Sequence, residues 1–338
     1  MSSSGLPTEK IRVAQFGLGP IGIECIRLAS GRPWAEVVGG IDIDPHKQQR
    51  HLGQLVGQQA LEGAFVYPSF EALLRHTKPH VVLHTASSHI EPTLEQLLPM
   101  VHAGVSVVSS CEELAFPSLR APKAAESLDR ACRASGARVV GGGVNPGFVM
   151  DLLPLVLTSV CCEVRSVFAR RVVHAASRRL PLQRKIGSGL DPAAFRSLWS
   201  EGSIGHAGFR ESVALVAHAL GWKLDSIEES CEPLVAQRDI ETAYLRVRSG
   251  QTSGLHQRAL GRIEGEVRIE LDLSMDLDAQ DPHDLIKIEG RPPIEVHVRG
   301  GVSGDDATVG ALVSAIPAVL EAPPGLLLAT DLAVPRWR

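Results

Sequence analysis

The sequence predicts an α/β protein with an N-terminal doubly wound parallel sheet and a second α+β domain built on a largely antiparallel sheet. Before about residue 150, short apolar runs bounded by glycine alternate with segments of helical period, which is typical of βαβ units. Beyond that point, several segments alternate apolar and polar residues, which indicates an antiparallel sheet with one solvated face. The length of 338 residues also favours two domains over one.

Six apolar runs in the first half are predicted strands, and helical segments separate them. The strands are expected at 11–16, 35–41, 64–67, 81–84 and 105–110, and from 137 onward. The helices are expected at 23–30, 69–76, 91–104 and 116–136. Strand and helix in this order predict parallel neighbours, because each crossover helix returns the chain to the same edge of the sheet.

The second half is expected to hold more strands than helices. The predicted strands are 164–173, 233–236, 243–249, 266–277, 284–290 and 294–300, and the predicted helices are 209–222 and 306–320. The expected organisation is a dinucleotide-binding domain over 1–146, a substrate and dimerisation domain over 147–302, and a C-terminal helix and tail over 303–338 that return to the first domain.

Composition excludes several classes of protein. The formal net charge of −4 gives no bulk attraction to nucleic acid, and an aromatic content of 4% leaves little material for base stacking. No apolar run reaches the length of a membrane span, and the polar start MSSSGLPTEK lacks the core of a signal peptide, so we expect a cytoplasmic protein. The six cysteines lack paired zinc spacing, so no metal is expected.

A glycine-rich turn follows the first predicted strand and opens a helix. Residues 17–22 read GLGPIG, and the expected cofactor contacts are Gly17, Gly19, Pro20, Ile21 and Gly22. In GxGxxG the first glycine permits the turn, the second lets the backbone approach a diphosphate, and the third lets helix and strand pack closely. Asp42 ends the second strand, where a carboxylate takes the adenosine ribose hydroxyls. A Rossmann domain that binds NAD is therefore predicted.

The choice between NAD and NADP stays open at this stage. A carboxylate at Asp42 repels a 2′-phosphate, which favours NAD. However, His46, Lys47 and Arg50 follow closely and would accept that phosphate if the loop folds back, so NADP is the alternative.

Small polar residues follow the later strands of the predicted sheet. The expected cofactor contacts among them are Thr85, Ala86, Ser87, Ser110, Cys111 and, in the VNPG segment, Asn145. Ligands of open parallel sheets lie outside the carboxyl ends of the strands, so these residues are candidates for the nicotinamide half of the site. Ordinary Ser/Thr turn chemistry is the alternative interpretation.

Two adjacent carboxylates, Glu112 and Glu113, come directly after the fifth strand. Nicotinamide oxidoreductases of the glucose–fructose oxidoreductase and inositol dehydrogenase class have CEKP here, and the CEEL of this chain resembles it with Glu113 at the lysine position. A carboxylate in place of an ammonium group favours a cationic species such as an iminium. The alternative is that both carboxylates are favoured by the dipole of the next helix.

Longer motifs extend the resemblance to a more specific family. The segments are CEELAFP at 111–117, GGGVNPGFVMDLLP at 141–154, RRLPLQRKIGSGL at 178–190, GSIGHAGFRESVALVAHALGW at 202–222, and DDATVGALVSAIPAVLEAPPGLL at 305–327. They resemble motifs of the native amine dehydrogenases, which are similar to 2,4-diaminopentanoate dehydrogenase and, in fold, to dihydrodipicolinate reductase. The resemblance implies NAD(P)H-dependent reductive amination of small ketones or aldehydes with ammonia, and the reverse deamination of primary amines.

The resemblance also implies roles for particular residues. Glu113 is then the catalytic acid–base group. The expected walls of the substrate pocket are Phe148, Met150, Leu180, Leu182, Ile204, His206 and Phe209, although core packing is the alternative for each apolar one. A homodimer is expected from the family and from the prevalence of two-fold assemblies.

Seven cations lie between residues 165 and 185 with no acidic residue among them. A solvated strand face and salt bridges between subunits are one interpretation. The other is that one arginine binds a substrate carboxylate, which would favour 2,4-diaminopentanoate dehydrogenase or a related amino-acid dehydrogenase. A nicotinamide-binding sensor without catalysis is a third alternative.

Overall fold

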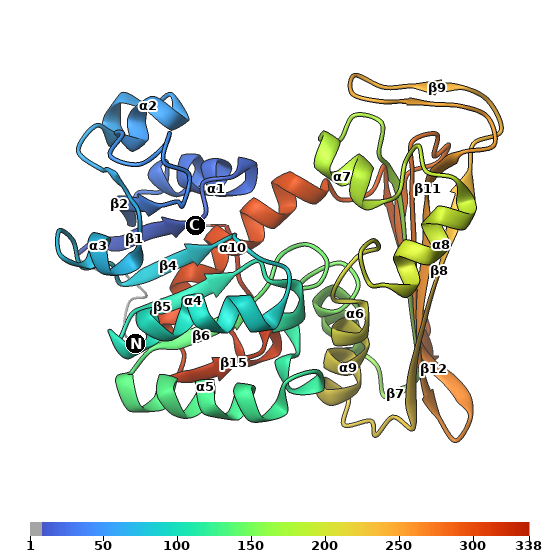
Figure 1. The fold of residues 1–338 in the computed structure, drawn as a ribbon. Helices are drawn as coiled ribbons and strands as arrows, with labels where there is room; N and C mark the ends of the chain where they lie inside the picture. The colour runs from blue at the N-terminus through green and yellow to red at the C-terminus, as the bar shows by residue number, and fades with distance from the viewer. Residues whose placement is uncertain (1–8, 338) are drawn as a thin grey trace. The chain divides into compact units, whose positions relative to one another are not determined.

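The computed structural model describes residues 9–337. The chain forms two compact units, one of Met1–Gly147 with Gly304–Arg338 and the other of Phe148–Ser303 (Figure 1). In the described part of the chain, no helix combines the length and apolarity that crossing a membrane requires.

The first unit is built on a seven-stranded sheet with the order β15-β6-β5-β4-β1-β2-β3. Its strands are β1 (Ile11–Phe16), β2 (Ala35–Ile41), β3 (Val66–Tyr67), β4 (Val81–His84), β5 (Ser106–Ser109), β6 (Arg138–Gly141) and β15 (Gly325–Leu327). Every neighbouring pair of these strands is parallel. The predicted doubly wound parallel sheet is therefore confirmed.

Helices cover both faces of this sheet. They are α1 (Pro20–Ser30), α2 (Leu52–Val56), α3 (Phe70–Leu74), α4 (Ile90–His102), α5 (Pro122–Ser135) and α10 (Gly304–Glu321), with short 3₁₀ turns η1 (Gln59–Leu61), η2 (Glu112–Ala115), η3 (Pro117–Leu119) and η4 (Ala329–Asp331). One hydrophobic cluster joins α1 and α10 to one face, and a second joins α3, α4 and α5 to the other.

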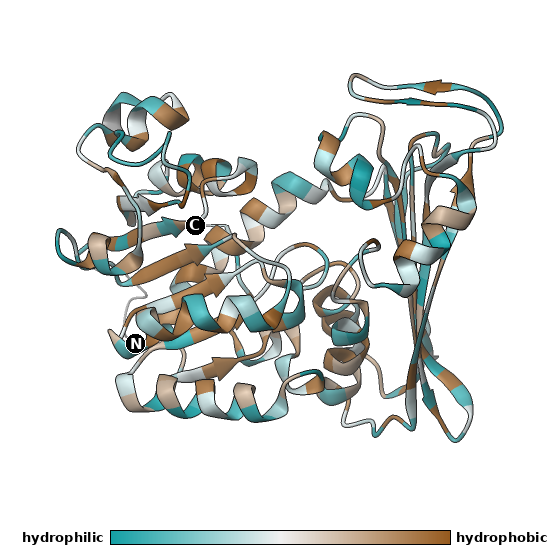
Figure 2. Ribbon diagram, viewed as in Figure 1, coloured by the Kyte–Doolittle hydropathy of each residue, from teal (hydrophilic) through white to brown (hydrophobic). Residues whose placement is uncertain are grey.

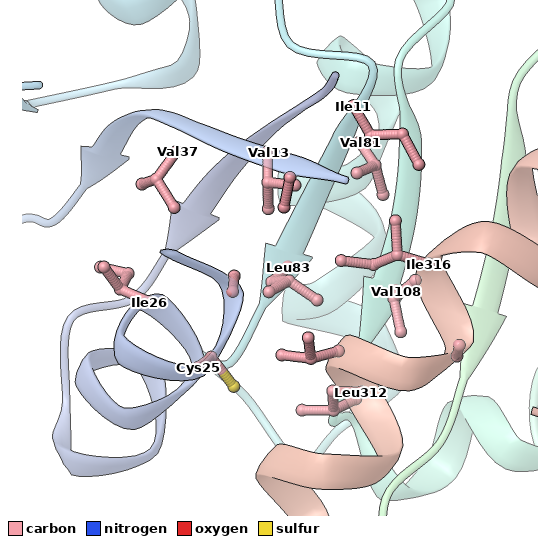
Figure 3. Packing of buried hydrophobic residues seen from close by; sticks show 14 of the residues in the cluster. Ile11, Val13, Cys25, Ile26, Val37, Val81, Leu83, Val108, Leu312 and Ile316 are labelled. Carbon is pink, nitrogen blue, oxygen red and sulfur yellow. The ribbon is translucent and has the colours of Figure 1, made fainter. Parts of the chain in front are cut away.

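The core of the first unit is aliphatic, as the low aromatic content requires. Figure 3 shows Leu312 and Ile316 of α10 beside the strand residues Leu83 and Val108, while Ile26 of α1 lies beneath Val37 of β2. The central strands β4 and β5 are buried along their length and appear in brown in Figure 2. Strands buried on both faces read as continuous apolar runs, which is why the sequence pattern located them.

The second unit is built on a six-stranded sheet with the order β14-β13-β7-β12-β11-β8. Its strands are β7 (Glu163–His174), β8 (Ser226–Val235), β11 (Thr252–Ile263), β12 (Glu266–Asp276), β13 (His283–Arg291) and β14 (Ile294–Arg299), and β9 (Ile240–Glu241) with β10 (Arg246–Val247) forms a separate ribbon. The helices are α6 (Leu152–Thr158), α7 (Leu180–Lys185), α8 (Pro192–Ser200) and α9 (Phe209–Ala219). All pairs in the large sheet are antiparallel except β7 with β12, which confirms a largely antiparallel sheet.

One expected strand was wrong, and one long strand was missed. Residues 243–249 lie mostly outside strands, whereas 252–263 form β11 in the interior of the sheet. The sequence pattern of β11 contains two glycines, and because glycine usually weakens a strand, this segment was not predicted as one. A Cβ at Gly254 would lie 2.0 Å from the carbonyl oxygen of Met275, and one at Gly261 would lie 2.8 Å from the Val213 side chain. These glycines allow close approach of the neighbouring strand and of α9.

Candidate active site

The glycine turn between β1 and α1 has the geometry of a diphosphate-binding loop. Gly17 has a φ of +86°, which favours glycine, and Gly19 is the extended N-cap of α1. A Cβ on Gly22 would lie 1.9 Å from the carbonyl oxygen of Gly17, so this glycine permits the tight turn. A Cβ on Gly19 would meet no atom within 4 Å, so the space that a diphosphate needs is open there. Pro20 begins the helix, and its first turn holds no acidic side chain, which suits an anion at the helix N-terminus.

A buried glutamine that the sequence analysis missed holds this turn. Gln15 is 1% exposed, and its Nε2 donates to the carbonyl of Gly17 at 3.1 Å and to Oγ1 of Thr85 at 2.8 Å. The Thr85 hydroxyl in turn donates to the Gly17 carbonyl at 3.1 Å. The side chain of Thr85 therefore supports the glycine turn rather than standing apart from it.

Asp42 joins the end of β2 to the glycine turn. Its Oδ2 accepts the backbone N–H of Leu18 at 2.8 Å and lies 3.1 Å from Nζ of Lys47, while Oδ1 accepts the N–H of Asp44 at 2.8 Å. Burial raises the pKa of Asp42, but the hydrogen bonds from Asp44, Leu18 and Lys47 outweigh it, so the net pKa lies below the usual value. Asp42 is thus an anion placed beside the loop, and Lys47 offsets its charge.

The other predicted cofactor residues lie at the same edge of the sheet but differ in exposure. Ala86 is exposed and Ser110 half-buried. The Ser87 hydroxyl fixes the next turn through bonds to the backbone of His89. The Cys111 side chain is fully buried in a hydrophobic cluster, and burial raises its pKa to about 11, so a cofactor contact by this residue stays a prediction.

Glu113 lies in η2, directly after β5, at the edge that also carries the glycine turn. Its Oε2 accepts the backbone N–H of Ile90, the first residue of α4, at 2.8 Å. Its Oε1 lies 3.1 Å from Nδ1 of His89 and 3.3 Å from Nε of Arg120. The carboxylate side chain is 10% exposed. A negative group is stabilised by the N-terminus of α4, so the geometry holds Glu113 in one place.

The sequence predicted a carboxylate here but not the residues that hold it. His89 and Arg120 are separated from Glu113 by 24 and 7 positions, and no spacing rule connects them. The alternative interpretation placed Glu113 in the dipole of the helix that follows it in the chain, but Glu113 binds the first N–H of α4. That helix precedes Glu113 in the chain, which a local pattern does not reveal.

The predicted pocket residues lie in the second unit, whereas Glu113 lies in the first. Phe148 is 38% exposed, and Leu180, Leu182, Ile204 and His206 are half-buried. Met150 and Phe209 are 0% and 1% exposed, as the core-packing alternative expects, and their role as pocket walls stays a prediction. Asn145, at the end of the first unit, is half-buried and precedes a cis peptide bond to Pro146.

The loop that carries His206 is held by a buried glutamine on β11. Gln257 is 0% exposed, accepts the N–H of His206 at 2.8 Å and donates to its carbonyl at 2.8 Å. The ring of His206 meets Phe209 edge-on, with 5.8 Å between centroids. Gln257 lies in the strand that the sequence analysis missed, so its role was missed too.

The cations of the basic run lie on or next to two elements of the second unit. Arg165, Arg170 and Arg171 form ion pairs with Glu163, Asp272 and Asp284 within the second unit, and the Arg171 pair is buried rather than solvated. The remaining cations of the run, Arg178, Arg179, Arg184 and Lys185, lie in or just before α7. No group of three or more potential metal ligands occurs among residues 9–337.

Comparison with known proteins gives one family match. The model described as the 2,4-diaminopentanoate dehydrogenase C-terminal domain matches residues 148–337. A relative named 2,4-diaminopentanoate dehydrogenase, from Acetoanaerobium sticklandii, is 29% identical over 334 residues, covering 97% of this chain and 95% of the relative. Another, named amine dehydrogenase, from Streptomyces virginiae, is 26% identical, covering 95% of this chain and 96% of the relative.

Solved structures share the fold along the whole chain. The structure of amine dehydrogenase from Mycobacterium smegmatis matches with a TM-score of 0.86 at 22% identity and covers 99% of both chains. Scyllo-inositol dehydrogenase from Lactobacillus casei, solved with NAD(H), matches with a TM-score of 0.59 at 14% identity, covering 96% of this chain and 92% of that one. The fold is therefore that of nicotinamide-dependent dehydrogenases.

Proposed function

The chain belongs to the family described as the 2,4-diaminopentanoate dehydrogenase C-terminal domain, and from this premise we propose that it is an NAD(P)H-dependent amine dehydrogenase. In one direction it aminates small ketones or aldehydes with ammonia, and in the other it deaminates primary amines. The relatives named amine dehydrogenase and 2,4-diaminopentanoate dehydrogenase support oxidoreductase chemistry at a C–N bond.

The first unit supplies residues that fit a nicotinamide dinucleotide. The open space at Gly19 and the N-terminus of α1 suit the diphosphate. Asp42 lies where it would accept the adenosine ribose hydroxyls. When bound, the dinucleotide supplies or accepts the hydride. NAD is the proposed cofactor, and Lys47, 3.1 Å from Asp42, makes use of NADP compatible with the same loop.

The observation that carries the proposal is the carboxylate of Glu113, fixed by Ile90 N–H at 2.8 Å at the edge of the sheet that carries the glycine turn. As a base, Glu113 takes a proton from ammonium so that ammonia can attack the carbonyl carbon. As an acid, it returns that proton to the carbinolamine hydroxyl, which leaves as water. As an anion, it then offsets the charge of the iminium that receives the hydride.

A spectrophotometric screen tests this function. The purified chain is mixed with NADH, ammonia and cyclic, linear or carboxylated carbonyl compounds, and oxidation of NADH is followed. We expect turnover that requires ammonia. Binding of NADH without turnover on any carbonyl would instead favour the nicotinamide-binding sensor.

A second candidate is 2,4-diaminopentanoate dehydrogenase or a related amino-acid dehydrogenase. The family description and the relative from Acetoanaerobium sticklandii favour it. Such a substrate needs a cation for its carboxylate, and Arg178, Arg179 and Arg184 are the candidates. Matched amines with and without a carboxylate distinguish the two functions, because only an amino-acid enzyme requires that group.

We also propose a cytoplasmic homodimer. All six cysteines are free thiols, as is usual in a reducing compartment. Two-fold dimers are the commonest soluble assembly. Light scattering after gel filtration measures the mass, and 36.2 kDa would be the monomer.

A further inference from the structure

The reaction proposed above exchanges one proton with solvent in each turnover. At a pH where ammonium and the product amine are both protonated, a carbonyl compound, ammonium, NADH and one proton give the protonated amine, NAD⁺ and water. The proton released by ammonium leaves with the carbinolamine hydroxyl as water. The proton that charges the product amine must therefore enter from solvent, and in deamination the same proton must leave.

Glu113 is poorly placed to exchange that proton directly. Its side chain is 10% exposed, and its Oε2 is engaged by the N–H of Ile90. Its Oε1 faces two groups, Nε of Arg120 at 3.3 Å and Nδ1 of His89 at 3.1 Å. A guanidinium group stays protonated at any working pH and cannot carry a proton through. An imidazole can, because it takes a proton at one nitrogen and gives one at the other.

His89 connects the buried carboxylate to solvent. Its side chain is 63% exposed, while its ring reaches Glu113. Its backbone is fixed on both sides, since its N–H donates to the Ser87 hydroxyl at 3.1 Å and its carbonyl accepts the Thr93 hydroxyl at 2.7 Å. The ring thus starts from a rigid position at the N-cap of α4.

We propose that His89 is the proton relay between Glu113 and solvent, an inference that rests on the proposed amine dehydrogenase function. In amination, Nε2 takes a proton from water while Nδ1–H passes to Oε1 of Glu113. In deamination, the proton that the substrate ammonium group gives to Glu113 leaves by the reverse route. The exposed ring then rotates, so that a protonated nitrogen again faces Glu113.

Three other charged residues lie close to His89 or Glu113 in the structure or in the chain. Arg120 contacts the same carboxylate oxygen, Glu112 is adjacent to Glu113 in the chain, and Glu91 lies in the first turn of α4. Arg120 therefore offers a matched control, because its removal disturbs the same oxygen without removing a group that relays protons.

The experiment compares wild type with H89A, H89Q and R120Q in steady-state deamination. The rate is measured over a pH series, in H₂O and D₂O, with and without added imidazole. For H89A and H89Q we expect kcat to fall about tenfold, less than for loss of a direct acid–base residue, with a larger solvent isotope effect. Imidazole should restore H89A. It should not restore R120Q, whatever activity that variant loses.

Each outcome decides the matter. If H89A and H89Q keep the wild-type kcat and isotope effect, the relay is wrong. It is also wrong if H89A loses activity that imidazole does not restore while its melting temperature is unchanged, because His89 then only positions Glu113. If wild type itself oxidises no amine, the proposed function fails, and the relay fails with it.

Discussion

Oε2 of Glu113 lies 2.8 Å from the backbone nitrogen of Ile90, so a residue at the edge of the sheet that carries the glycine turn also caps α4. The helix N-terminus carries a partial positive charge that favours the anion. The interaction holds the carboxylate that we propose as the acid–base group on a rigid element, which is what positioned proton transfer requires. Structure and chemistry at Glu113 are therefore coupled, and a test must separate them.

Replacing Glu113 should abolish most turnover without unfolding the chain. In E113Q the amide oxygen can still accept the Ile90 N–H, while the acid–base function is lost. We expect kcat to fall by about 10²–10⁴-fold, with the circular dichroism spectrum unchanged. The control is E112Q, which should keep near wild-type kcat. A loss in E112Q with an active E113Q would show that the neighbouring carboxylate performs the catalysis.

Two glycines of the cofactor turn should respond differently to replacement by alanine. Alanine at Gly19 meets no atom within 4 Å, and its φ of −71° is ordinary, so G19A should melt like wild type but raise the KM for NADH. Alanine at Gly22 would lie 1.9 Å from the Gly17 carbonyl oxygen, so G22A should lower the melting temperature as well. Calorimetry and NADH titration check both. Unchanged NADH affinity in G19A would contradict the placement of the diphosphate.

Lys47 should govern tolerance of NADPH. It lies 3.1 Å from Asp42, whose pKa is lowered and which therefore stays charged at working pH. Without the lysine, that charge repels a 2′-phosphate more strongly. In K47M we expect the ratio of kcat/KM for NADPH over NADH to fall about tenfold, equivalent to ~1.4 kcal/mol. K223M, in the second unit, is the control, and an unchanged ratio in K47M would remove Lys47 from cofactor selection.

The sequence predicted those parts of the fold and site whose signal is local. The buried runs of β4 and β5 and the glycines of the GxGxxG turn each follow from a few adjacent residues. Gln15 and Gln257 do not, because a buried amide is recognised only by partners far away in the chain, at Thr85 and at His206. Strand β11 was missed because its glycines are required by close packing against Met275 and Val213, which lie elsewhere in the chain.

A buried ion pair stabilises the second unit near Val302, just before α10 in the chain. Nε of Arg171 lies 2.9 Å from Oδ1 of Asp284, and both side chains are at most 4% exposed. The two residues also bind the carbonyl and the N–H of Val302, at 2.6 and 2.7 Å. D284A leaves a buried cation without its partner and should cost about 3–5 kcal/mol of unfolding free energy.

Urea unfolding measures that cost. The control is the pair of Lys287 and Glu295, 3.0 Å apart with side chains 46% and 59% exposed. E295A should cost no more than about 1 kcal/mol, as exposed pairs do. Equal costs in D284A and E295A would show that burial adds nothing to the Arg171 pair.

Asp272 should make stability depend on acid pH. Its carboxylate is buried and lies 3.0 Å from Nε2 of His256 and 3.2 Å from Nε of Arg170. Burial raises its pKa, but the bonds from His256 and Arg170 outweigh it, so the folded pKa lies below the ordinary 3.8. A lowered folded pKa means that the unfolded chain binds the proton first. The stability that Asp272 contributes is therefore complete above about pH 3.8 and is lost as the pH falls through the folded pKa.

Thermal melts of wild type and D272N between pH 7 and pH 2.5 test this sign. D272N should melt lower than wild type at neutral pH, and the difference should shrink below pH 3.8, where the protonated carboxyl resembles the amide. D239N changes an exposed aspartate at 3.6 Å from Arg246, and its smaller difference from wild type serves as the control. A gap between D272N and wild type that stayed constant to pH 2.5 would mean that Asp272 stabilises the sheet by shape and not by charge.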